Sequence, residues 1–165
     1  MGILFLCGGY YPNTSATGNC VKSIADLFSK NGYGVKIISK SANEKSYTDE
    51  INGQSIYRIT NKRLIGAAKL AKEKDGIVKD IHTIFYKSYW AINQLLKADG
   101  LDSSLVSEYV RQGEKIISET NIEAIVPCCM PAECLLAGYK LQEKHNELKL
   151  FPLLYDPYSE NLNFF

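Results

Sequence analysis

The sequence contains no hydrophobic run long enough to cross a membrane and no excess of charge of either sign. Its apolar stretches stay well below the ~18–20 residues that a membrane-spanning helix requires, and the apolar opening at 3–7 is too short for a secretory signal. Among 165 residues, 19 Lys and Arg are balanced by 18 Asp and Glu, which leaves a net charge of +1. We therefore expect a cytoplasmic protein that does not bind nucleic acid, because nucleic-acid binding needs a broad basic surface.

Histidine and cysteine are also scarce. The two histidines lie far in the sequence from the five cysteines, which are odd in number and show no repeated two-residue spacing. Neither a metal site nor a disulfide framework is therefore predicted. The adjacent Cys128 and Cys129 could form a redox or soft-metal site, but small thiols at the end of an apolar run favour packing in a reducing compartment.

Short apolar segments alternate along the chain with segments of helical periodicity. Several of the apolar segments lack the alternation of a half-exposed strand, which indicates strands buried on both faces, as in a parallel sheet. Strands are predicted at 3–7, 35–38, 55–60, 124–126 and 150–155, with 55–60 at an edge of the sheet. Helices are predicted around 21–28, 63–74, 81–96, 102–120 and 131–146, with Asp102 as an N-cap. This order predicts one α/β domain over residues 1–165, with a doubly wound, mostly parallel sheet of about five strands and helices on both faces.

Ligands of such sheets bind outside the carboxyl ends of the strands, where the winding reverses. This rule places the site on the loops at 8–18, 128–131 and 155–161. The first loop fits neither a dinucleotide fingerprint nor a Walker loop, because its glycines are wrongly spaced and no Gly-Lys-Ser/Thr follows. The segment Ser39-Lys40-Ser41 also lacks the acidic residue that would hold a ribose, so a nicotinamide enzyme is not favoured.

Two of these loops each leave two interpretations open. The first loop ends at a helix start that favours an anion, or else Ser15 or Thr17 simply caps the helix and Gly18 relieves crowding. The last loop carries carboxylates and aromatic rings that suit a sugar. Alternatively, its Asp156-Pro157 pair only starts a turn and Tyr158 fills the core.

Motifs at both ends of the chain occur in an order typical of one enzyme family. They are the apolar first strand, Gly8-Gly9-Tyr10-Tyr11-Pro12, Ser15-Ala16-Thr17-Gly18, Ile24-Ala25-Asp26-Leu27-Phe28, Asn31-Gly32-Tyr33-Gly34-Val35 and Leu154-Tyr155-Asp156-Pro157-Tyr158-Ser159-Glu160-Asn161. Together these motifs resemble the N-terminal part of family 4 glycosyltransferases with the GT-B fold. The last is similar to the Arg/His-Asp-Pro-Trp-x-x-Asn segment that this family carries after its fifth strand.

The resemblance implies an enzyme that transfers a sugar from a nucleotide-sugar donor in glycan biosynthesis and needs no other cofactor. Residues 1–165 would form its N-terminal, acceptor-binding half, inactive alone and partnered by a second Rossmann-like half that holds the donor. The resemblance implies that four residues face the donor diphosphate: Gly9, Ser15, Thr17 and Gly18. It also implies that six residues contact a glycan or lipid-linked acceptor: Tyr11, Met130, Glu133, Tyr158, Glu160 and Asn161.

The resemblance leaves Asp156 as the candidate catalytic residue. Many relatives carry a His in the loop after the fourth strand or directly before the Asp of the closing segment, where this chain has Cys128-Cys129 and Tyr155. Asp156 would accept the proton of an acceptor hydroxyl or orient that hydroxyl.

Two further segments have alternative interpretations, and so has the whole chain. Segment 58–74 holds six basic residues against one acidic residue, so it could lie peripherally on an anionic membrane or form a solvated helix over the core. The aromatic segment 85–92 favours core packing, with acceptor contact as the alternative. The competing function for the chain is a non-catalytic Rossmann-like module that binds a nucleotide or sugar.

Overall fold

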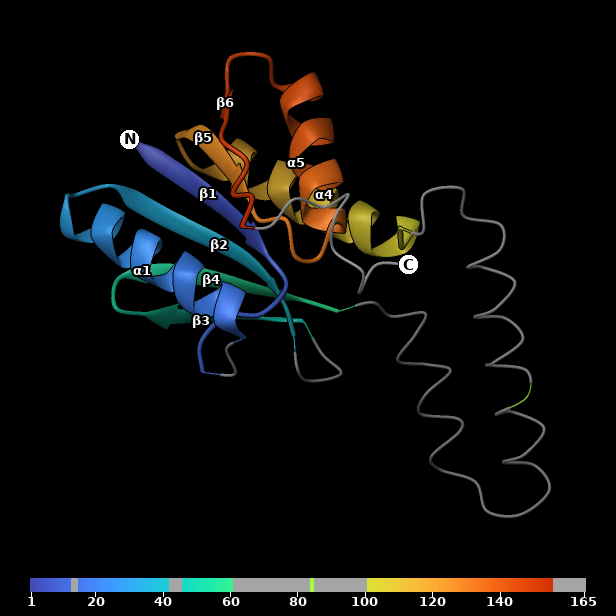
Figure 1. The fold of residues 1–165 in the computed structure, drawn as a ribbon. Coiled ribbons are helices and arrows are strands. Elements are labelled where there is room, and N and C mark those ends of the chain that lie inside the picture. Colours follow the sequence, from blue (N-terminus) through green and yellow to red (C-terminus); the bar gives the residue numbers. More distant parts are fainter. Residues whose placement is uncertain (13–14, 42–45, 61–83, 85–100, 156–165) are drawn as a thin grey trace.

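The chain folds as an α/β domain around a six-stranded, mostly parallel sheet (Figure 1). The computed structural model describes residues 1–12, 15–41, 46–60, 84 and 101–155. The strands are β1 (Gly2–Cys7), β2 (Gly34–Lys40), β3 (Tyr47–Ile51), β4 (Gln54–Ile59), β5 (Ile122–Pro127) and β6 (Lys149–Leu150). The helices are α1 (Ala16–Lys30), α4 (Ser103–Glu119) and α5 (Glu133–Lys144). The helices predicted at 63–74 and 81–96, and the aromatic segment, lie outside the described residues, apart from the single residue Ile84.

The strand order is β3-β4-β2-β1-β5-β6, and all pairs are parallel except β3 with β4. The central strand β1 is buried along its whole length, as its apolar run predicts. Its side chains alternate between two hydrophobic clusters. Leu4 and Leu6 pack with residues of α4 and α5, whereas Ile3, Phe5 and Cys7 pack with residues of α1. Each fully buried Leu or Phe contributes about 1.5–3 kcal/mol through apolar burial.

The helix ends follow local sequence signals. Ser15 is the N-cap of α1, and Gly32 behind its C-cap has a φ of +83°, a conformation that glycine adopts without a Cβ penalty. Asp102 caps α4 as predicted, because its carboxylate accepts hydrogen bonds from the amides of Ser104 and Leu105. Helix α5 has no side-chain cap, but Glu133 stands in its first turn and Lys144 in its last, as the helix dipole favours.

Two strand predictions are wrong in detail. Segment 55–60 is β4, but it lies between β2 and β3 and is therefore not an edge strand. The edge is β3, a polar strand that the apolar pattern does not reveal, and it brings the number of strands to six. The hairpin between β3 and β4 turns at Asn52 and Gly53, which have positive φ angles of 54° and 75°.

The last predicted strand is shorter than expected. Only Lys149–Leu150 forms β6, followed by one isolated bridge between Cys128 and Leu153. Pro152 lies between them and cannot donate a ladder hydrogen bond, which limits the strand. In the part of the chain that the structure describes, no helix has the length and apolarity needed to span a bilayer.

Candidate functional site

The carboxyl ends of β1 and β5 meet where the chain reverses its direction of travel across the sheet. From β1 the chain continues to β2 on one side, and it later returns to β5 on the other side. The loops that follow are called here the β1 loop (residues 8–12) and the β5 loop (residues 128–131). The amide of Gly8 donates to the carbonyl of Met130 at 3.2 Å, and the amide of Cys128 donates to the carbonyl of Leu6 at 2.8 Å. The two loops therefore form one continuous rim, in the position where parallel sheets bind ligands.

The start of α1 lies against this rim. The Ser15 hydroxyl accepts from the Gly18 amide at 3.2 Å, which confirms the interpretation of Ser15 as a cap. A Cβ at Gly18 would stand 2.6 Å from the Gly9 carbonyl oxygen, so glycine is needed here for close packing against the β1 loop. Thr17 reaches the other loop, because its hydroxyl lies 3.9 Å from the sulfur of Met130.

Helix α1 also directs backbone donors outward. The amides of Gly18 and Asn19 are satisfied by Ser15. The amides of Ala16 and Thr17 have no acceptor among the described residues, as is usual in the first turn of a helix. Such donors, together with the helix dipole, can hold an anion. The structure thus brings together the predicted residues Gly9, Ser15, Thr17, Gly18 and Met130.

The backbone of the β1 loop is held by hydrogen bonds from the side chain of Arg58 in β4. The guanidinium Nη1 donates to the carbonyl of Tyr10 at 3.1 Å and to the hydroxyl of Ser39 at 2.8 Å, and Nη2 donates to the carbonyl of Tyr11. Its Nε donates to Asp49 at 3.3 Å. The Arg58 side chain is only 4% exposed. The prediction that Arg58 opens a solvated or membrane-facing basic segment is therefore wrong for this residue, and residues 61–74 lie outside the described part.

A second polar chain holds the side chain of Tyr10. The buried Tyr10 hydroxyl donates to Gln54 at 2.5 Å, and the amide nitrogen of Gln54 donates to Asp26 of α1 at 2.8 Å. Lys22 completes the chain with an ion pair to Asp26 at 2.5 Å. Burial raises the pKa of Tyr10, and the nearby Asp26 carboxylate raises it further. Desolvation acts to raise the pKa of Asp26, but the hydrogen bonds from Lys22 and Gln54 outweigh it and hold this pKa below its usual value.

The adjacent Cys128 and Cys129 are buried, as the packing interpretation of this pair predicts. Cys7, Cys128, Cys129 and Cys134 are buried and unpaired, and only Cys20 is exposed. Burial raises the pKa of Cys128 to about 11 and also raises the pKa of Cys7 and Cys134, so these thiols stay protonated at neutral pH. Over the described residues, no group of His, Cys, Asp and Glu side chains has the arrangement of a metal site.

The remaining predicted site residues have separate positions. Tyr11 is 45% exposed, and its carbonyl accepts a hydrogen bond from Arg58. The carboxylate of Glu133 accepts from the Asp102 amide at 2.9 Å, which ties the start of α5 to the start of α4. Asp156, Tyr158, Glu160 and Asn161 lie outside the described residues, but Tyr155 directly before them is 38% exposed. Partial burial raises the pKa of Tyr155 to about 12, helped by the nearby Cys128 and Cys20.

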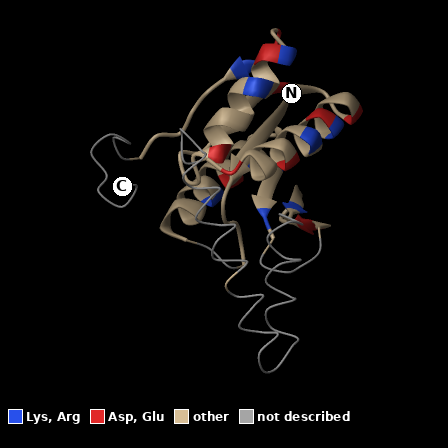
Figure 2. Cartoon of the chain, turned by 90° about the vertical axis from the view of Figure 1, so that its right-hand side faces the viewer, with Lys and Arg blue, Asp and Glu red and all other residues tan. Residues whose placement is uncertain are grey.

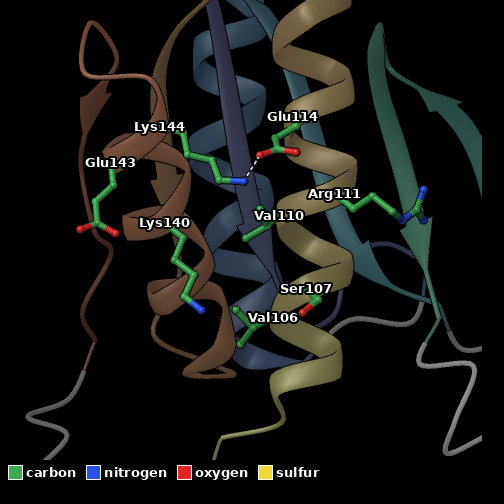
Figure 3. A pocket seen from close by; sticks show the side chains of 8 residues that line it. All are labelled: Val106, Ser107, Val110, Arg111, Glu114, Lys140, Glu143 and Lys144. Carbon is green, nitrogen blue, oxygen red and sulfur yellow. Dashed lines mark hydrogen bonds and ion pairs between the residues drawn. The ribbon is translucent and has the colours of Figure 1, made fainter.

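A groove of about 500 Å³ lies away from the rim, between α4 and α5 (Figure 3). Val106 and Val110 form its floor, and charged side chains line its walls. These charges are mostly paired: Lys144 with Glu114, as Figure 3 shows, and Arg111 with Glu108 at 2.7 Å. Figure 2 shows the same interspersion of basic and acidic residues along the helices. We therefore attribute this groove to helix packing rather than to a ligand site.

Comparisons with known protein families, with curated proteins and with solved structures find no match for this chain. The functional interpretation therefore depends on the geometry of the rim and on the sequence motifs alone.

Proposed function

We propose that this chain is the N-terminal, acceptor-side half of a glycosyltransferase that uses a nucleotide-sugar donor, and that its sheet is doubly wound. The observation that supports the proposal most directly is the convergence of three elements at the reversal point of the sheet. These are the β1 loop, the start of α1 and the β5 loop. In doubly wound sheets this convergence is the usual place of a nucleotide or phosphate ligand.

The rim suits a donor diphosphate on its α1 side. The outward amides of Ala16 and Thr17 offer two donors at the positive end of a 15-residue helix. Gly18 lets the start of α1 pack closely against the Gly9 carbonyl, which brings the backbone donors of α1 next to the β1 loop. In this proposal the second half of the enzyme holds the rest of the donor, and no further cofactor takes part.

The β5 side of the rim is proposed to receive the acceptor. Tyr11 of the β1 loop and Tyr155, which follows β6, are exposed aromatic residues, and aromatic rings stack on the C–H faces of sugars. Met130 and Glu133 follow β5, and Tyr158, Glu160 and Asn161 would complete the acceptor site. Asp156 would accept or orient the proton of the acceptor hydroxyl. The enzyme is proposed to act in the cytoplasm, and any contact with an anionic membrane would involve residues 62–74 without Arg58.

The binding part of this proposal is tested by nuclear magnetic resonance on the ¹⁵N-labelled chain with a panel of sugar nucleotides. We expect chemical-shift changes at Gly8, Gly9, Thr17 and Met130. Gly113 and Glu114 on the α4 side serve as the internal control and should stay unchanged. Shift changes centred on the control residues, or none with any donor, would contradict the proposal.

The catalytic part is tested in the full-length protein by hydrolysis of the same donors. Asp156→Asn should reduce turnover while donor-induced shifts at the β1 loop persist. Near-normal turnover would remove Asp156 from the chemistry. Donor binding without hydrolysis or transfer by the full-length protein would instead favour the non-catalytic binding module.

A further inference from the structure

Arg58 is a buried cation that is hydrogen-bonded to several partners at once. Its N–H groups donate hydrogen bonds to two successive backbone carbonyls of the β1 loop, those of Tyr10 and Tyr11. They also donate to Ser39 and Asp49. A buried charge is tolerated only where it is neutralised and hydrogen-bonded. Here Asp49 supplies the counter-charge, and the two carbonyls and the Ser39 hydroxyl accept the other hydrogen bonds.

These contacts fix the orientation of the peptide planes in the β1 loop. In a trans peptide the carbonyl and the following N–H point in opposite directions. Because the Tyr10 carbonyl faces the guanidinium, the Tyr11 amide faces away from it, and it has no acceptor among the described residues. The next peptide has no N–H because it precedes Pro12. One backbone donor of this loop, the Tyr11 amide, thus points away from the guanidinium.

We propose that Arg58 is a positioning residue for the β1 loop: it holds the Tyr10 and Tyr11 carbonyls inward so that the Tyr11 amide, with the start of α1, receives a diphosphate. This inference rests on the proposed function for its ligand, but the anchoring of the loop by Arg58 can be tested without any ligand. The guanidinium itself does not contact the diphosphate, because its side chain is only 4% exposed and four of its five N–H groups bind the loop, Ser39 and Asp49.

The test uses Arg58→Lys, which keeps the positive charge but replaces a planar fork of five donors by a single ammonium group. One ammonium cannot reach both carbonyls, Ser39 and Asp49 in the same geometry. The long-range electrostatic attraction of an anion is therefore preserved, and only the orientation of the loop is removed. The matched control is Arg111→Lys, since Arg111 is 59% exposed and, among the described residues, bonds only to Glu108.

The first readout is the ¹³C chemical shift of the Tyr10 and Tyr11 carbonyl carbons, which responds directly to the loss of a hydrogen bond to the carbonyl oxygen. We expect upfield changes at both carbons in Arg58→Lys and none in Arg111→Lys. The second readout is the affinity of the chain for inorganic pyrophosphate, used as the diphosphate probe. It should fall about tenfold in Arg58→Lys, as expected for one misdirected hydrogen bond to a charged group.

The outcomes separate the two proposals. Unchanged carbonyl shifts in a folded Arg58→Lys would overturn the positioning role, whatever the chain binds. So would changed carbonyl shifts with an unchanged pyrophosphate affinity. If the wild-type chain binds neither pyrophosphate nor any sugar nucleotide, the proposed function fails, while the carbonyl shifts still support the anchoring by Arg58.

A second variant covers the case in which Arg58→Lys does not fold. Asp49→Asn, on the edge strand β3, removes the counter-charge but leaves the guanidinium and all its other acceptors. We expect smaller changes at the same two carbonyl carbons. Unchanged shifts in both Asp49→Asn and a folded Ser39→Ala would overturn the proposal.

Discussion

The β1 loop and the β5 loop lie side by side at the same edge of the sheet, yet they are held by different kinds of interaction. The β1 loop depends on polar side chains from distant strands, with Arg58 on its carbonyls and Gln54 on the Tyr10 hydroxyl. The β5 loop is held by backbone hydrogen bonds, such as that from the Cys129 amide to the Leu153 carbonyl at 2.9 Å, and by packed thiols.

This difference has a physical consequence. A side-chain anchor fixes the direction of a particular carbonyl, but it is lost with one substitution. Backbone hydrogen bonds and apolar packing tolerate a change of side chain better, and the Cys128 thiol, with its raised pKa, does not titrate in acid, where Asp26 does. We therefore expect the β1 loop to be the sensitive partner, both to mutation and to pH.

The largest effect is expected where α1 presses on the β1 loop. Gly18→Ala would place a Cβ 2.6 Å from the Gly9 carbonyl oxygen, a backbone atom that cannot move aside cheaply. We expect a loss of about 1–3 kcal/mol in the free energy of unfolding, as for overpacking in a tight core, measured by chemical denaturation. The matched control is Gly34→Ala, where the nearest such atom is 3.7 Å away. Equal stabilities of the two variants would show that the contact between α1 and the β1 loop is loose.

A smaller effect is expected from the hydroxyl that anchors the loop. Tyr10→Phe removes the donor to Gln54 but keeps the ring that packs among the core residues. The free energy of unfolding should fall by about 1 kcal/mol, the usual net contribution of a buried hydrogen bond. Tyr47→Phe, with a partly exposed ring on β3, is the control and should be neutral. A neutral Tyr10→Phe would mean that packing alone holds the loop.

The pH dependence of stability should separate the two loops next. The pKa of Asp26 is lowered on folding, so its contribution is present above the unfolded pKa of about 4 and is lost as pH falls through the folded value. The destabilisation by Asp26→Asn should therefore be present at neutral pH, at no more than about 1 kcal/mol, and shrink in acid. Cys128→Ala, on the β5 side, should change the free energy of unfolding by the same amount over this acid range, because the Cys128 thiol is protonated throughout. Denaturation curves at neutral and acid pH measure the loss in free energy of unfolding for each variant. The same pH dependence in the two variants would contradict the expected difference between the two loops.

The sequence predicts the strands that form the rim better than the side chains that hold it. The buried strands β1, β2 and β5 are recognisable because a strand covered on both faces must be apolar throughout. Parallel strands end at a common edge, so the meeting of the β1 loop and the β5 loop also follows from the sequence. The apolar pattern does not reveal strand β3 because an edge strand can be polar, although Asn52-Gly53 is a strong hairpin signal between β3 and β4.

The role of Arg58 illustrates what a sequence pattern leaves out. Its place in a short alternating strand is compatible with an exposed basic residue. Its charge favours the interpretation of 58–74 as a solvated or membrane-facing segment. Its actual acceptors, the carbonyls of Tyr10 and Tyr11, are 48 and 47 positions away along the chain. Only the pairing of β4 with β2 brings them within reach, so no local periodicity could have indicated the contact.

The smallest effect on stability is expected at the exposed thiol of α1. Cys20→Ser should change the free energy of unfolding by no more than about 0.5 kcal/mol, as for most exposed positions. The same substitution should abolish rapid labelling of the native chain by a disulfide reagent at neutral pH. The four other thiols are buried, and the Cys128 thiol, with a pKa of about 11, is almost entirely protonated there. They should react only when the chain opens, so their labelling rate should rise with added denaturant. Rapid native labelling of Cys128 or Cys129 in Cys20→Ser would show that the β5 loop opens readily, and the β5 loop would then be the more mobile of the two.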